Sequence, residues 1–199
     1  DHFEMPVYAY DTWKYTVGSS ALDPDWREPD FDDSQWSTGN GGIGYGDGDD
    51  ATIVAQGISV MMRKTFTVTD STSVLEAILM MDFDDGFKAY LNGVEIASMN
   101  MWPGNLDWNI WARDAHEALL YQGLEPDSFY INKDLFKSLL LNGKNVLAIQ
   151  THNVEPNSSD LSSIPFLIFG VKDSINNFPA PPTWFRAPDT YAFYAKFKL

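Results

Sequence analysis

The sequence predicts an all-β protein, an antiparallel β-sandwich of the jelly-roll type with one or two short helices and an extended C-terminal tail. Turn signals rich in Gly, Asp and Asn crowd the first half of the chain. Between them lie short runs in which apolar and polar residues alternate, as in strands with one buried face. Later runs are apolar almost throughout, as core strands are. Many short strands with few helical turns favour a sandwich.

The strands are expected in order along the chain. Trp13, Tyr15 and Val17 alternate with polar neighbours and predict the first of them. The pair Asn92-Gly93 between two β-rich runs predicts a two-residue hairpin turn. The expected strands cover residues 12–17, 58–68, 73–83, 86–91, 94–100, 144–154 and 163–171.

Two short helices are expected, at 113–120 and at 133–143. In the second, three leucines fall on one face and Gly143 supplies a C-terminal stop. After Lys172 the composition changes to a run rich in proline, which cannot form a central strand. We therefore expect a sandwich domain over 1–172 and an extended tail or linker over 173–199, packed by aromatic side chains.

Composition narrows the classes of function. The chain has 199 residues, 28 acids and 13 bases, and a net charge of −15, which repels the phosphate backbone of nucleic acids. It has no cysteine, which excludes thiol catalysis, disulfides and cysteine-based zinc sites. No apolar run approaches the length of a membrane span. Abundant Trp, Tyr, Asp, Asn and Gly suggest a secreted or cell-surface bacterial β-domain.

Several stretches together resemble one family. They are PDWREPDFDDSQWSTGNGGIGYGDGDDAT, VMMRKTFTV, MDFDDGFKAYLNGVEIASMNM, LNGKNVLAIQTHN and SSDL. They are similar to the galactose-binding-like β-sandwich, an accessory domain of the carbohydrate-binding-module type in large secreted bacterial proteins. Such domains lie next to CotH-like kinase domains and polysaccharide-degrading domains. The resemblance implies a non-catalytic role, often with a structural calcium ion, and no kinase motif is present.

Paired acids raise the alternative of catalysis. Asp82 and Asp84 are two residues apart on an expected strand, so their carboxylates share a face about 7 Å apart, within the range a glycosidase uses. However, Asp84, Asp85 and Gly86 also have a sufficient local role, because Asp and Gly together shape tight turns. His152 near two serines lacks the Gly-x-Ser-x-Gly elbow of a nucleophile.

A second group of acids suggests a cation site. Asp47, Asp49 and Asp50 lie in a glycine-rich loop that could wrap a hard cation, which prefers carboxylate and carbonyl oxygens. The spacing is not that of an EF-hand, and a solvated acidic loop is the alternative. With the resemblance, calcium is the expected ion, and Asp82 and Asp84 are further candidate ligands.

The loop over 101–113 is the candidate carbohydrate site. Sugar rings stack on aromatic faces while their hydroxyls meet polar side chains. This loop places tryptophans among Pro, Gly and Asn rather than on a periodic strand. The candidate ligand residues are Trp102, Trp108, Trp111, Asn105, Asp107, Asn109 and Arg113. The alternative is a loop that folds back and buries its tryptophans as a lid. A second candidate surface is Tyr45 beside His152 and Asp160.

We therefore expect a non-catalytic carbohydrate-binding module that holds a polysaccharide or oligosaccharide near partner domains of a larger chain. The second hypothesis is a structural or protein-interaction domain without a glycan site. The weakest is a glycoside hydrolase.

Overall fold

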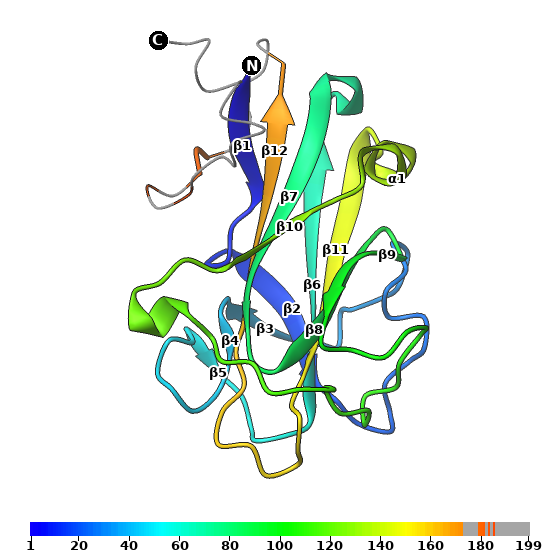
Figure 1. Ribbon diagram of the computed structural model, residues 1–199. Coiled ribbons are helices and arrows are strands. Elements are labelled where there is room, and N and C mark those ends of the chain that lie inside the picture. Colours follow the sequence, from blue (N-terminus) through cyan, green and yellow to red (C-terminus); the bar gives the residue numbers. More distant parts are fainter. Residues whose placement is uncertain (173–178, 182, 184, 186–199) are drawn as a thin grey trace.

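Two antiparallel sheets pack face to face in the computed structural model, which describes residues 1–172, 179–181, 183 and 185 (Figure 1). One sheet has the order β1 (His2–Val7), β12 (Ser163–Val171), β7 (Val74–Phe83), β10 (Asp127–Tyr130). The other has the order β3 (Ser37–Asn40), β2 (Thr12–Val17), β6 (Ser59–Val68), β11 (Gly143–His152), β8 (Gly86–Leu91), β9 (Val94–Met99). A short parallel pair joins β4 (Ile43–Gly44) and β5 (Thr52–Ile53). The predicted β-sandwich is confirmed.

The β8–β9 hairpin is as the sequence predicts. Asn92 and Gly93 separate the two strands, and both have a positive φ, 50° and 86°. A two-residue turn with positive φ at both positions matches the twist of the flanking strands. The hairpin continues into the sheet, since β8 pairs with β11 from Leu91 opposite Leu147 to Gly86 opposite His152.

The main core lies between the two sheets, where inward side chains interdigitate. Leu79 and Phe169 of one sheet and Met62 and Ile149 of the other are buried in one cluster. Aromatic rings join the layers, with the ring centroids of Phe66 and Phe169 6.2 Å apart. Alternation along each strand thus places one set of residues in this core, as the expected strands require.

The outer face of the six-stranded sheet is covered by two loops. Residues 18–36, which we name the N-terminal loop, and residues 100–113, which we name the aromatic loop, both lie over it. A second apolar cluster forms there from Trp26, Met61, Tyr90, Val146 and Ala148, with Trp36 and Trp108 packed against it. The inner strands β8 and β11 are therefore buried on both faces over most of their length, more than alternating strands alone would indicate.

The expected helix over 113–120 is wrong. This segment is irregular and ends in a 3-10 turn, Leu120–Gln122. The carboxylate of Asp82 accepts hydrogen bonds from the backbone nitrogens of Leu119 and Leu120 at 2.6 and 2.9 Å, and Asp85 accepts one from His116 at 2.9 Å. These amides therefore pair with carboxylates at the end of β7 rather than with carbonyls one helical turn back.

The second expected helix exists but is shorter, spanning α1 (Lys133–Leu139). Asn132 caps its start by accepting from the nitrogens of Asp134 and Leu135. It ends early because the Asn145 side chain captures the nitrogen and the carbonyl of Leu141. Gly143 has a positive φ of 93°, yet it begins β11 instead of ending the helix.

Most of the predicted tail over 173–199, including Phe178 and Trp184, lies outside the described residues. Of those described, Pro179 accepts a hydrogen bond from the nitrogen of Met5 at 2.9 Å. The ring of Phe185 meets Phe3 edge to face at 5.5 Å. The division of the chain near Lys172 stays a prediction.

Candidate carbohydrate-binding and cation-binding sites

The aromatic loop presents two of its three tryptophans to solvent. Trp102 is 51% exposed and Trp111 49%. They line a shallow hollow of about 340 Å³ together with Asn109, Ile110, Ala112 and Arg113. The guanidinium carbon of Arg113 lies 5.1 Å from the centroid of the Trp102 ring, a cation–π contact that orients both side chains. The backbone nitrogen of Arg113 donates to Asn100 at 2.7 Å, which closes the loop at its base.

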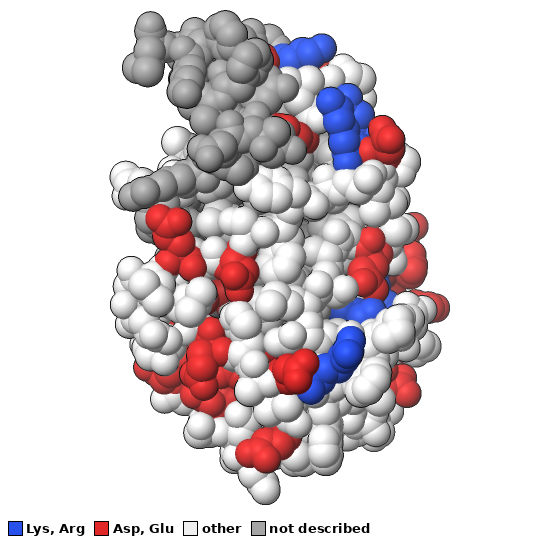
Figure 2. Space-filling model, viewed as in Figure 1, with Lys and Arg blue, Asp and Glu red and all other residues white. Residues whose placement is uncertain are grey.

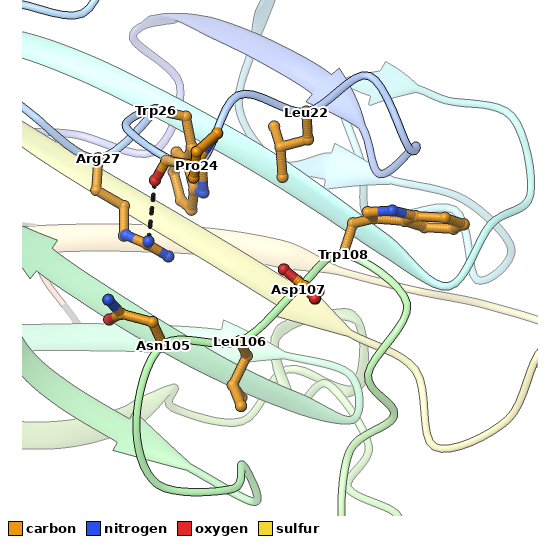
Figure 3. A pocket seen from close by; sticks show the side chains of 8 residues that line it. All are labelled: Leu22, Pro24, Trp26, Arg27, Asn105, Leu106, Asp107 and Trp108. Carbon is orange, nitrogen blue, oxygen red and sulfur yellow. Dashed lines mark hydrogen bonds between the residues drawn. The ribbon is translucent and has the colours of Figure 1, made fainter.

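Trp108 takes a different place. It is half-buried, packs on the cluster over the six-stranded sheet and lines a second pocket (Figure 3). That pocket has a volume of about 340 Å³ and lies between the N-terminal loop and the aromatic loop. Its lining residues are Leu22, Pro24, Trp26, Arg27, Asn105, Leu106, Asp107 and Trp108. The loop therefore exposes two of its tryptophans and packs the third inward.

The candidate ligand residues divide between these two pockets. Arg113 belongs to the hollow beside Trp102 and Trp111, whereas Asn105 and Asp107 line the pocket beside Trp108. Proximity in the sequence suggested a single platform. The structure instead places the loop with one face outward and the other against the sheet.

The second candidate surface, Tyr45 beside His152, does not form as an accessible surface. Tyr45 is 8% exposed and His152 is completely buried. The Tyr45 hydroxyl accepts a hydrogen bond from Asn153 at 2.8 Å, and His152 Nδ1 lies 2.7 Å from the carbonyl oxygen of Ile110. Burial lowers the pKa of His152 to about 4, so the imidazole is neutral near pH 7. Both side chains are interior groups.

Asp47, Asp49 and Asp50 converge, as the glycine-rich loop predicts. Each offers a carboxylate oxygen within 4.8 Å of the others'. Both oxygens of Asp50 and one of Asp49 are buried without a hydrogen-bond partner among the described residues. A side chain at Gly44 could not fit, since its Cβ would clash with the carbonyl oxygen of Leu161 and would lie 2.5 Å from Asp50 Oδ2. The hydroxyl of Ser162 lies 3.1 Å from Asp49 and is a neutral donor to this group.

The electrostatics of this acidic cluster favour a bound cation. Burial, and then the neighbouring carboxylate of Asp47, raise the pKa of Asp49 to about 7. Burial, followed by repulsion from Asp49 and Asp47, raises the pKa of Asp50 to about 8. Converging, desolvated carboxylates with several unpaired oxygens are the ligand set that a hard cation such as Ca²⁺ takes. The residues present therefore fit such an ion.

Asp82 and Asp84 do not join that ligand set. Asp82 is occupied by backbone amides of the following loop, as described above. Asp84 instead converges with Glu117 and Asp160, with one oxygen of each within 4.8 Å of the others'. Burial, and then repulsion from Asp85 and Asp160, raise the pKa of Asp84 to about 8. Sequence reasoning missed Glu117, because it was assigned to a helix that does not form.

Acidic side chains gather over the part of the molecule where β4 and β5 lie, as Figure 2 shows in the view of Figure 1.

The described part of the chain contains no helix with the length and hydrophobicity of a membrane span.

Comparison with known proteins rests on structure alone. No protein-family model matches the chain, and no curated protein matches it in sequence. Among solved structures, the fold is similar to Bacteroides uniformis β-glucuronidase, with a TM-score of 0.52 and 15% identity over 84% of this chain and 18% of that one. A calcium-binding mutant of B. uniformis β-glucuronidase 2 matches with a TM-score of 0.52 and 14% identity, over 84% and 18%.

A further match is the glycosyl hydrolase family 2 member from Bacteroides cellulosilyticus DSM 14838, with a TM-score of 0.50 and 15% identity over 84% of this chain and 20% of that one. The chain thus spans about a fifth of the length of these enzymes. At this level of identity the likeness concerns the fold, and the chain is a β-sandwich of the kind found as one part of large glycosidase chains.

Proposed function

We propose that the chain is a non-catalytic carbohydrate-binding domain of a larger secreted or cell-surface bacterial protein. The observation that carries this proposal is the hollow of the aromatic loop, where Trp102 and Trp111 are half-exposed beside Arg113. Exposed tryptophans in a polar loop present flat apolar faces at little conformational cost, which suits the C–H face of a sugar ring. The guanidinium of Arg113 and the amide of Asn109 supply donors for sugar hydroxyls.

The setting of the fold supports an accessory role. The similar enzymes contain this sandwich as about a fifth of their length. A domain that binds a polysaccharide next to a partner domain raises the effective concentration of that polysaccharide for its neighbour. The partners in this proposal are therefore a polysaccharide or oligosaccharide and the neighbouring domains of a longer chain.

A structural calcium ion at Asp47, Asp49 and Asp50 belongs to the proposal. The unpartnered, buried oxygens of Asp50 support it, and a calcium-binding mutant exists of one protein with a similar fold. The ion would fix the loop between β4 and β5 by replacing repulsion between carboxylates with coordination. It would supply folding stability rather than chemistry.

The acids lend less support to hydrolysis. Asp82 accepts two backbone hydrogen bonds and Asp85 accepts from His116 and Val154, so these carboxylates hold loops in place. Asp84 has a raised pKa, as a general acid would. However, neither pocket beside the aromatic loop includes any of these acids. A glycosidase needs its two carboxylates to flank a cleft that holds the sugar.

Affinity electrophoresis against a panel of plant and algal polysaccharides tests the proposal. We expect at least one gel to retard the protein, and we expect Trp111→Ala to weaken the apparent affinity about tenfold, since one stacking contact with its buried area contributes about 1.4 kcal/mol or more. Trp102→Ala should have a similar effect. Tyr121→Ala is the matched control, because this aromatic is 46% exposed but lies outside the aromatic loop.

Two outcomes would contradict the proposal. If no gel retards the wild-type protein, the domain has no glycan site and the hypothesis of a structural or protein-interaction domain is favoured. If retardation occurs but both tryptophan variants keep it, the hollow is not the binding site.

A further inference from the structure

Two polar side chains of β11 are completely buried and incompletely paired. Gln150 and His152 each have 0% relative exposure. The amide nitrogen and oxygen of Gln150, and Nε2 of His152, have no hydrogen-bond partner among the described residues. Because His152 Nδ1 pairs with a carbonyl oxygen, Nδ1 carries the proton and Nε2 is a free acceptor. Folded proteins leave few such groups unpaired, so these need an explanation.

Both side chains lie under the aromatic loop. Residues two apart on a strand point to the same face, and cross-strand neighbours share that face. The cross-strand neighbours Lys88 and Ser59 hold the loop from this face: Lys88 Nζ donates to the carbonyl of Gly104 at 2.8 Å and Ser59 Oγ to that of Trp108 at 2.6 Å. The aromatic loop is thus held on the sheet through its backbone carbonyls. Beneath it lie the side chains of Gln150 and His152, which we name the polar floor and which have unpaired donors and acceptors.

A pocket opens beside this floor, between the two covering loops (Figure 3). Trp26 and Trp108 line it and pack against the cluster that includes Ala148, which precedes Gln150 on the same face of β11. Its volume of about 340 Å³ is within the range of small-ligand sites, about 300–1,000 Å³. An aromatic wall beside unpaired polar groups is the usual composition of such sites.

We propose that this pocket extends to Gln150 and His152 when the domain binds its glycan, and that the floor takes a neutral saccharide unit through its hydroxyls. Each hydroxyl donates once and can also accept, so two neighbouring hydroxyls of a sugar can donate to the Gln150 oxygen and to His152 Nε2, and one of them can accept from the Gln150 nitrogen. The carboxylate of a uronate only accepts, so in the place of a donating hydroxyl it would leave an acceptor among the Gln150 oxygen and His152 Nε2 unpaired. The inference rests on the proposed function and narrows its ligand class to neutral sugars.

Gln150→Leu tests the inference by separating binding from stability. In the free protein, an apolar side chain replaces an amide that makes no hydrogen bond, so we expect an equal or higher melting temperature. Affinity for the polysaccharide that retards the wild-type protein should fall about tenfold or more. Gln150→Met, which is unbranched, repeats the test if the leucine variant does not fold.

Asn145→Leu is the matched control on the same strand. Asn145 is also 0% exposed, but its side chain is paired with Leu141, Gly143 and Asn92. We expect a lower melting temperature with unchanged affinity. Gln150→Leu should thus lose affinity and keep its melting temperature, whereas Asn145→Leu should keep affinity and lose melting temperature. If Gln150 had only a structural role, its substitution would lower the melting temperature as that of Asn145 does.

The probes are the neutral polysaccharides laminarin and arabinoxylan and the uronates alginate and polygalacturonate. Retardation by a neutral gel that Gln150→Leu weakens supports the inference. Unchanged affinity of Gln150→Leu, a clear loss of melting temperature in both Gln150→Leu and Gln150→Met, or retardation of the wild-type protein by uronates alone overturns it while the proposed function stands. No retardation in any gel overturns both.

Discussion

Adding calcium to the cation-free protein at about pH 8.5 is expected to raise its melting temperature by about 5–10 °C when the free ion is about 100-fold above its Kd. The physical reason is the cluster of Asp47, Asp49 and Asp50, whose charges repel one another in a partly desolvated loop. An ion that binds only the folded state stabilises it by an amount that grows with the logarithm of its concentration over Kd. Thermal unfolding in the presence of a chelator and then of calcium measures the effect.

The pH dependence of the cation-free protein follows from the raised pKa values, about 7 for Asp49 and about 8 for Asp50. In the unfolded chain these acids lose their protons at about pH 4, so between there and pH 8 the folded state binds more protons. Stability therefore falls as pH rises towards 8 and levels off above it. The pKa of Asp84 is also raised to about 8, so this residue makes the stability of the folded protein fall further over the same pH range. Bound calcium should remove the share of this pH dependence that comes from Asp49 and Asp50.

Asp50→Asn isolates the cluster. It removes one buried charge, so without cation it should unfold at a higher temperature than the wild-type protein at about pH 8.5, and its response to calcium should be mostly lost. Asp30→Asn is the charge-matched control, because Asp30 is exposed and lies outside this loop. A wild-type melting temperature that is the same with chelator and with calcium would contradict the cation site.

Replacing Arg63 by alanine is expected to destabilise the fold by about 3–5 kcal/mol. Its side chain is 2% exposed and lies under the N-terminal loop. Its Nε donates to Asp33 at 2.8 Å, and its guanidinium also donates to the carbonyls of Trp26 and Glu28. It lies 5.2 Å from the ring of Phe31 as well. Its loss leaves a carboxylate and two carbonyls without their donor and detaches the loop that covers the sheet.

The measurement is unfolding by urea followed through tryptophan fluorescence, which should shift to the red as Trp26 becomes exposed. Lys64→Ala is the control from the next position. Its ion pair with Asp11, at 3.3 Å, is near the surface and should contribute less than about 1 kcal/mol. Equal losses in the two variants would show that Arg63 does not hold the loop.

Much of the fold could be predicted from local patterns. Apolar alternation predicted β6 and β11, and the Asn92-Gly93 turn predicted the β8–β9 hairpin, because strand faces and tight turns depend on adjacent residues. The acidic loop was predicted for the same reason: Asp47, Asp49 and Asp50 are held together by their own spacing. The helix over 113–120 failed, since carboxylates from a distant strand compete for its amides.

The sequence by itself determined that this chain is a β-sandwich, where its hairpin turns, and which short loop concentrates acids. The tertiary structure alone decided which tryptophans face water, that His152 is interior, and that Asp84 meets Glu117 and Asp160 rather than the acidic loop. The physical reason is the distance along the chain over which each effect acts. Backbone periodicity and turn chemistry act between neighbours, whereas burial and the meeting of charges depend on how the two covering loops pack on a sheet built from strands far apart in the chain.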